Sequence, residues 1–194
     1  MRKIILASQS PRRKQLLQWA EIPFEVRDVE TDESYPAGLL PGQVAIHIAR
    51  NKALSALDND KSADITNASF PILAADTIVV LNDEIIGKPA NKEDAIAILK
   101  RLSGKKHFVI TGVVLLSGKE ISFADKTEVE FHELTDEQIE FYVDNYKPFD
   151  KAGAYAIQEW VGVVGIKSVN GDFYNVMGLP VSRVVQELEK LTRV

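Results

Sequence analysis

The stretch that decides the fold is KIILASQSPRRKQLL, residues 3–17, which joins an apolar strand to a helix. Residues 3–7 are mostly apolar and predict a short buried strand. Ser10 is a favoured N-cap residue and Pro11 suits the first helical position, so we expect a helix from there to about Ala20. The chain therefore opens with a strand-to-helix corner.

Two arginines, Arg12 and Arg13, fall in the first turn of that helix. The N-terminal end of a helix favours acids, so cations there cost stability unless an anion lies among them. Free backbone N–H groups, the hydroxyls of Ser8 and Ser10 and the two guanidinium groups would together bind a polyphosphate. The alternative is a capped surface helix whose arginines point into water. The preceding apolar strand and the paired serines favour the binding site.

Size and charge restrict the class of protein. With 194 residues, 45% of them hydrophobic, the chain suits a single domain over residues 1–194, either undivided or with two lobes that share a cleft. The net charge of −5 argues against general attraction to nucleic acid or anionic lipid. There is no cysteine, which excludes disulfides and thiolate chemistry. No run is long enough to cross a membrane and the start is unlike a signal peptide, so we expect a cytoplasmic protein.

Helical and extended patterns are mixed along the rest of the chain. Apolar runs predict strands at residues 24–29, 72–81, 84–86, 107–116 and 120–134. Helices are predicted from Pro41 to about Leu57, Asn91 to Leu102, Thr135 to about Asn145, and from Pro180 onward. A hairpin is predicted between residues 161–169 and 172–176, and a polar loop over 58–69. These patterns favour an α/β fold with a mixed sheet flanked by helices.

Asp76 lies inside the apolar run 72–81, where an unpaired carboxylate is expensive to bury. Two interpretations remain open. The aspartate is either structural, ending a strand or pairing with an arginine, or it is a metal ligand or general base. Glu33, in an acidic loop, is by itself a solvated charge. Together with Asp76 it would supply the one or two carboxylates that a hard cation bound to phosphates takes from a protein.

Lys52 and Lys88 are individually weak candidates, because most such lysines are solvated. With Arg12 and Arg13 they would bring four cations to a triphosphate. Phosphoryl chemistry depends mainly on such positioning and charge stabilisation.

The segment DKAGAYAIQ, residues 150–158, is a charged loop that leads into apolar sequence. Gly153 would allow a close backbone approach. Gln158 offers an amide donor and acceptor suited to reading a base edge, although a hydrogen-bonded loop glutamine is the more common explanation.

Missing motifs exclude several enzyme classes. The chain has no P-loop, no dinucleotide-binding glycine motif and no Gly-x-Ser-x-Gly elbow. His47, His107 and His132 are scattered, without zinc-ligand spacing. Water activated by a carboxylate and a hard metal is the simplest mechanism left.

Motifs spread in order along nearly the whole chain resemble the Maf family. They are LASQSPRR (6–13), Glu33, RNKA (50–53), ADTIV (75–79), GKP (87–89) and DKAGAY (150–155). The resemblance implies an inosine-triphosphate-pyrophosphatase-like fold, with an elongated mixed sheet and two lobes around a central cleft. It also implies nucleoside triphosphate pyrophosphatase activity that needs a divalent cation, Mg²⁺ or Mn²⁺, and a link to cell-division arrest.

The same resemblance implies roles for individual residues. Asp76 would be the proton acceptor, and Glu33 with Asp76 would bind the metal. Positions implied in handling the triphosphate and the metal are Ser8, Arg13, Glu33, Lys52 and Lys88. Positions implied in base choice are Arg12, Thr77 and Gln158.

Within the family, the chain resembles the branch that acts on dTTP, UTP and modified pyrimidine triphosphates more than the 7-methyl-GTP branch. One departure is Glu159-Trp160, where that branch often has smaller residues. A nucleotide-sensing regulator without turnover and a nucleic-acid-binding protein are the rival functions, and the net charge argues against the second. A homodimer is an expectation from the family alone.

Overall fold

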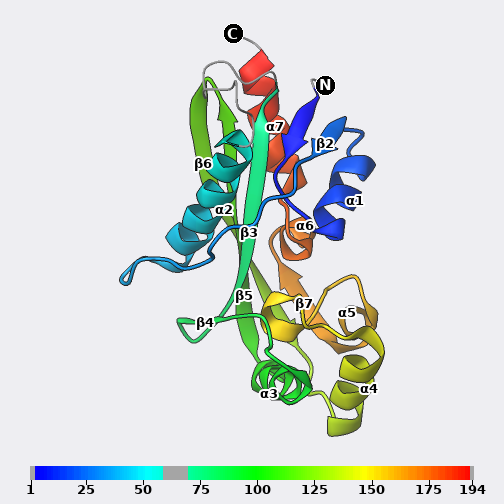
Figure 1. Ribbon diagram of the computed structural model, residues 1–194. Coiled ribbons are helices and arrows are strands. Elements are labelled where there is room, and N and C mark those ends of the chain that lie inside the picture. The colour runs from blue at the N-terminus through cyan, green and yellow to red at the C-terminus, as the bar shows by residue number, and fades with distance from the viewer. Residues whose placement is uncertain (1–2, 59–69, 193–194) are drawn as a thin grey trace. The chain divides into compact units, whose positions relative to one another are not determined.

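The computed structural model describes residues 3–58 and 70–192, so the predicted loop at 58–69 lies almost entirely outside the described residues (Figure 1). The helices are α1 (Pro11–Trp19), α2 (Pro41–Asp58), α3 (Lys92–Leu102), α4 (Asp136–Tyr146), the 3₁₀ turn η1 (Ala152–Ala154), α5 (Trp160–Gly165), α6 (Phe173–Met177) and α7 (Val181–Thr192). The strands are β1 (Ile4–Leu6), β2 (Phe24–Val26), β3 (Ile72–Leu81), β4 (Glu84–Ile86), β5 (Lys106–Ser117), β6 (Lys119–Phe131) and β7 (Ile166–Asn170).

The strands form a mixed sheet in the order β2-β1-β3-β5-β6-β7, with β4 paired to β3. β1 is parallel to both β2 and β3, whereas β4 runs antiparallel to β3 and β7 antiparallel to β6. The predicted α/β fold with a mixed sheet flanked by helices is confirmed.

The chain divides into two compact units. The first unit comprises Met1–Asp76, Thr111–Asp125 and Gly178–Val194, and the second comprises Thr77–Ile110 and Lys126–Met177. Strands β3, β5 and β6 each contribute residues to both units.

The core of the first unit lies where α2 packs on the sheet. Small residues of α2 allow the close approach and meet apolar side chains of β1, β3 and β5; the buried set includes Ala49, Ala53, Ala56, Ile5, Ala7, Ile72, Ala74 and Val114. Gly112 on β5 is needed there, because a Cβ at this position would lie 2.3 Å from the carbonyl carbon of Ala45. Figure 1 shows α2 running alongside β3.

Capping signals fix the helices of the second unit as predicted. Asn91 accepts a hydrogen bond from the Asp94 N–H at the start of α3, and its buried stripe is Ala95, Ile98, Leu99 and Leu102. Thr135 and Gln138 form the predicted capping box of α4.

The predicted hairpin over residues 161–176 is wrong. Its first arm begins as α5 and its second arm is helix α6, and β7 pairs with β6 instead. The physical reason is local: the Asp172 carboxylate accepts a hydrogen bond of 2.7 Å from the Tyr174 N–H, which favours a helical turn over an extended one. The strand predicted over 24–29 is also shorter, ending at Val26.

Within residues 3–58 and 70–192, none of the helices combines the length and the apolar character that crossing a bilayer requires.

Candidate functional site

The register of two parallel strands brings the strand-to-helix corner level with Asp76. Leu6, the last residue of β1, pairs with Leu73 of β3, and the Ala7 N–H donates to the Leu73 carbonyl. Because β3 continues where β1 ends, Asp76 lies just beyond the point at which the chain turns toward α1. In open α/β sheets, ligands bind at such carboxyl ends of strands.

Arg13 is buried at this corner, with only 8% of its surface exposed. Its Nε donates to the carbonyl of Gly178 at 2.8 Å, and its Nη1 donates to the hydroxyl of Ser8 at 3.2 Å. The Ser8 oxygen also accepts from the Ser10 N–H at 3.2 Å. Ser10 occupies the predicted N-cap position, but its side chain makes no capping hydrogen bond. The corner is therefore organised by Ser8, whose hydroxyl ties the turn to the arginine.

The pKa of Arg13 reflects both its burial and nearby charges. Burial lowers the pKa of Arg13 to about 10, Asp76 and Glu33 act to raise it, and Arg12 acts to lower it. The guanidinium keeps its charge at neutral pH. The first turn of α1 contains no acid of its own, so the carboxylates that compensate this charge come from other elements.

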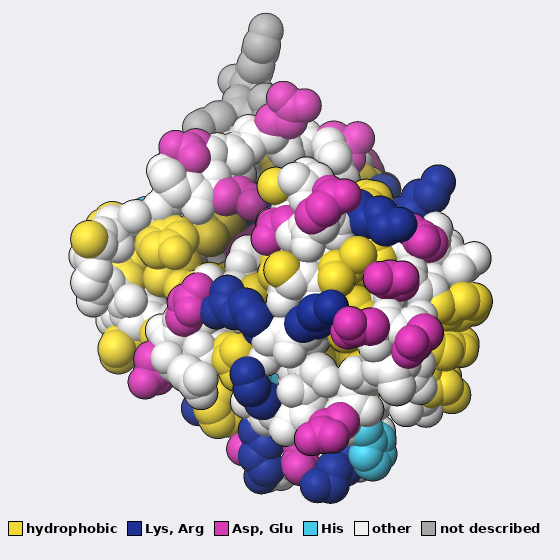
Figure 2. Space-filling model, turned by 90° about the horizontal axis from the view of Figure 1, so that it is seen from below, with side chains coloured by type: hydrophobic (Ala, Val, Ile, Leu, Met, Phe, Trp, Pro, Cys, Tyr) yellow, Lys and Arg dark blue, Asp and Glu magenta, His cyan; other side chains and the backbone are white. Residues whose placement is uncertain are grey.

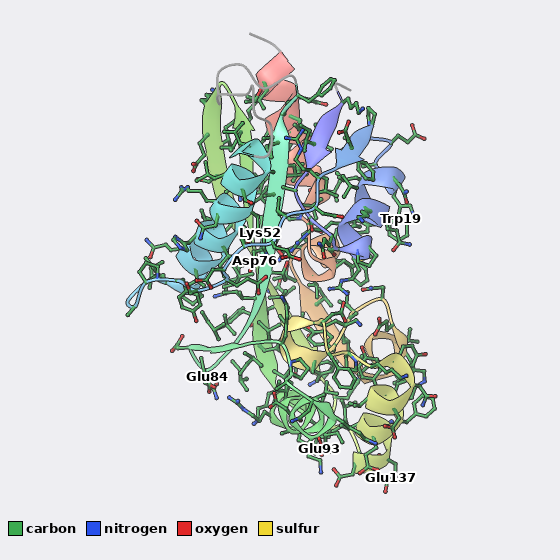
Figure 3. The ribbon with its side chains drawn as sticks, in the orientation of Figure 1. Trp19, Lys52, Asp76, Glu84, Glu93 and Glu137 are labelled. Carbon is green, nitrogen blue, oxygen red and sulfur yellow. The ribbon has the colours of Figure 1, made fainter. Side chains whose placement is uncertain are left out.

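Lys52 of α2 bridges the two predicted metal-binding carboxylates. Its Nζ donates to Asp76 Oδ1 at 2.6 Å and to Glu33 Oε1 at 2.9 Å. Lys52 and Asp76 are largely buried, with 14% and 12% of their side chains exposed, whereas the Glu33 side chain is 43% exposed. Figure 3 shows Lys52 and Asp76 next to each other, from α2 and β3. Asp76 is thus a paired carboxylate, as its position in an apolar strand requires.

The same two carboxylates are the predicted metal ligands, and here both contact one ammonium nitrogen, at 2.6 and 2.9 Å. Over residues 3–58 and 70–192, no group of three or more His, Cys, Asp or Glu side chains is arranged to hold a metal. A cation at Asp76 and Glu33 would therefore complete its coordination with phosphate oxygens and water, as Mg²⁺ commonly does.

Three of the remaining candidates belong to the second unit. Thr77 follows Asp76 on β3 and is half-buried, while Lys88 and Gln158 are exposed, in the loops after β4 and before α5. Arg12, in the first unit, is half-buried at the start of α1. Among the predicted site residues, hydrogen bonds thus link Ser8 to Ser10 and Arg13. A second set of hydrogen bonds links Lys52 to Asp76 and Glu33.

Two features were missed from sequence. The Gly178 carbonyl, which holds Arg13, comes from what reads as an ordinary turn before α7. The second is the pair of contacts that Tyr142 and Lys151 make with Glu159. Tyr142 carries no sequence signal, and Lys151 belongs to the DKAGAY motif, which does not predict this contact. The unusual pair Glu159-Trp160 marks their neighbourhood.

The first unit of this α/β protein thus holds a buried arginine and a lysine that bridges two carboxylates. Residues 3–191 match the family model described as Maf-like protein. The chain belongs to the Maf family.

Relatives of similar length share nearly half of the sequence. A dTTP/UTP pyrophosphatase of Cytophaga hutchinsonii is 49% identical over 97% of this chain and 84% of its own length. Proteins of the same name from Phocaeicola vulgatus and Bacteroides thetaiotaomicron are 48% and 45% identical, each over 97% of this chain and 96% of their own length.

One solved structure, a nucleoside-triphosphatase / dITP/XTP pyrophosphatase from Mycobacterium abscessus, matches with a TM-score of 0.37 and 12% identity, over 66% of this chain and 72% of that one. At that score the likeness carries no argument about this chain.

Proposed function

We propose that this protein is a dTTP/UTP pyrophosphatase, which hydrolyses a pyrimidine nucleoside triphosphate to the monophosphate and pyrophosphate. The observation that carries the proposal is the Lys52 ammonium, which donates to Asp76 at 2.6 Å and to Glu33 at 2.9 Å, in a chain whose relatives bear that name. A basic group beside a carboxylate pair suits a phosphate chain that arrives with a cation.

The chain's own residues suggest a division of labour. Asp76 accepts a proton from the water that attacks the α-phosphorus, and the bond from that phosphorus to the bridging oxygen breaks. The electron pair leaves with pyrophosphate. Arg13, Ser8 and the N–H groups at the start of α1 hold the phosphates, and Ser10 and Arg12 belong to the same corner. Lys52 and Lys88 stabilise the charge that develops on the leaving group.

A divalent cation, Mg²⁺ or Mn²⁺, would be held by Asp76 and Glu33. When bound it would neutralise phosphate charge and orient the phosphate chain. Lys52 already donates to both carboxylates, so its ammonium group holds them close to each other. Arg12, Thr77 and Gln158 are the residues we assign to base choice. The family expectations of a homodimer and a cytoplasmic location are part of this proposal.

A substrate panel tests the proposed activity. The purified protein is incubated with dTTP, UTP, 5-methyl-UTP, CTP, GTP and 7-methyl-GTP, with Mg²⁺, with Mn²⁺ and with a chelator, and the products are identified. We expect monophosphate and pyrophosphate from dTTP and UTP, in the presence of a cation.

Other outcomes would identify a different protein. Orthophosphate as the first product would contradict attack at the α-phosphorus. Preferred turnover of 7-methyl-GTP would place the chain in the other branch of the family. Tight nucleotide binding without any product would support the nucleotide-sensing regulator.

A further inference from the structure

We infer that Tyr142 and Glu159 are positioning residues that set base preference, because they fix the turn that carries Gln158. The inference rests on the proposed function and on the assignment of Gln158 to base choice. All the residues involved belong to the second unit.

Tyr142 connects helix α4 to both ends of this turn. Its side chain is completely buried. The hydroxyl donates to Glu159 Oε2 and accepts a hydrogen bond of 3.1 Å from the Ala156 N–H. One phenol oxygen thus holds the residue two before Gln158 and the residue directly after it.

The second oxygen of Glu159 faces a buried cation. Lys151 Nζ lies 3.5 Å from Glu159 Oε1 and donates to Asp150 at 2.9 Å, with 9% of the lysine side chain exposed. The Glu159 side chain is 22% exposed. A carboxylate that contacts a tyrosine on one oxygen and an ammonium on the other has its orientation fixed from two sides.

The backbone of the turn is equally constrained. The Glu159 N–H donates to the Ala156 carbonyl at 3.1 Å, and the Glu159 carbonyl accepts from the Gly162 N–H at 2.9 Å. A Cβ on Gly162 would lie 1.7 Å from the carbonyl oxygen of Ile157, so the start of α5 presses directly on the turn.

The side chains of the turn differ in burial. Ala156 and Ile157 are buried, with 5% and 4% exposed, while Gln158 is exposed. An amide distinguishes bases only when its donor and acceptor are held in place, since a mobile one adapts to several base edges. Fixing the backbone on both sides of Gln158 is therefore a means of selecting the base.

The test compares two conservative variants with a matched control. Tyr142→Phe removes only the hydroxyl, and Glu159→Gln keeps the shape but removes the charge. Tyr146→Phe is the control, because Tyr146 stacks on Tyr142 at 5.1 Å from the same helix and is 37% exposed. For each, kcat and KM are measured with dTTP, UTP, CTP and GTP, together with the melting temperature.

We expect KM for dTTP to rise about tenfold in Tyr142→Phe and Glu159→Gln, with kcat within about twofold of the parent. The ratio of kcat/KM for dTTP over CTP should fall by a similar factor. Tyr146→Phe should keep the parental values.

Two results would overturn the inference alone: an unchanged base ratio in the folded variants, or an equal loss for every nucleotide. If Tyr142→Phe does not fold, the inference is tested with Glu159→Gln and Lys151→Met instead. The measured quantity is again the ratio of kcat/KM for dTTP over CTP. A parent enzyme that cleaves no triphosphate would instead overturn the proposed function, and the inference with it.

Discussion

At the scale of single residues, Asp76 and Arg13 are buried charges that the fold supplies with partners. Asp76 accepts from Lys52, and Arg13 is held by a serine hydroxyl and a backbone carbonyl. Removing one partner from such a set leaves the other uncompensated, which is costly in a buried site. Substitutions here should therefore keep shape and hydrogen bonding.

Asp76→Asn tests the proposed base. The amide is isosteric and can still accept from Lys52, so we expect a folded protein. Turnover of dTTP should fall by about 10²–10⁴-fold, the usual contribution of a general base. Pyrophosphate release under saturating dTTP is the measurement.

Asp83→Asn is the matched control, because Asp83 lies in the exposed turn after β3. It should retain parental turnover. Near-parental activity of the Asp76→Asn enzyme would remove this residue from the mechanism.

At the scale of elements, β5 carries an unusual buried histidine. His107 is 1% exposed, stacks on Phe131 at 5.4 Å and is hydrogen-bonded through Nε2 to the Tyr155 hydroxyl at 2.8 Å. Burial lowers the pKa of His107 to about 4. Through Tyr155, this cluster contacts the segment that continues to Gln158.

The histidine predicts how stability depends on pH. The unfolded chain binds the proton near the ordinary pKa of about 6.5, and the folded protein only near 4. The free energy of unfolding should therefore decrease as the pH falls from about 6.5 to 4, by on the order of 3 kcal/mol from this group. Urea titrations at several pH values measure the slope.

In the His107→Gln variant, the slope over this pH interval should be shallower. His132→Gln, at an exposed position on the same unit, should keep the parental slope. Equal slopes in all three proteins would show that His107 does not contribute.

The close contact between α2 and β5 predicts that a larger residue at Gly112 destabilises the fold. Gly112→Ala would place a methyl group 2.3 Å from the Ala45 backbone, and the neighbour is main chain that cannot turn away. We expect a loss of about 1–3 kcal/mol or more in the free energy of unfolding. Gly87→Ala, with nothing within 4 Å of the added Cβ, should change it little. Thermal unfolding of the two variants distinguishes them.

The sequence predicts well those elements that depend on residues close together along the chain. The capping box at Thr135, the cap at Asn91 and the apolar run around Asp76 each depend on residues within a few positions. The 161–176 hairpin failed because Asp172 caps a helix there and β7 pairs with β6, a distant strand. The setting of Arg13 could not be predicted either, since its carbonyl partner lies 165 residues away.

At the scale of the whole molecule, the distribution of charge bears on the kind of partner. Figure 2 shows acidic and basic side chains interspersed over the face it displays, with apolar groups between them. Exposed pairs such as Lys100–Asp136 and Arg101–Glu84 account for part of this pattern. Together with the net charge of −5, this does not favour a nucleic-acid-binding function, for which a single-sign surface is expected.

The division into two units predicts the effect of a truncation. A chain that stops after Met177 lacks α7 and the Gly178 carbonyl, both of which belong to the first unit. We expect the buried Arg13 to lose a partner and the first unit to fail to fold. Hydrogen exchange should show loss of protection in β1, α1 and α2. A truncated chain with parental protection there would contradict the importance of the C-terminal segment.

The hydrogen bond between Arg13 and Gly178 also bears on how the protein folds. The two residues are 165 positions apart along the chain, so their contact closes a long loop. Closing a loop costs conformational entropy, and this cost rises only slowly as the loop becomes longer. The corner that we assign to phosphate binding is therefore assembled by a long-range contact and forms only when the first unit has folded around it.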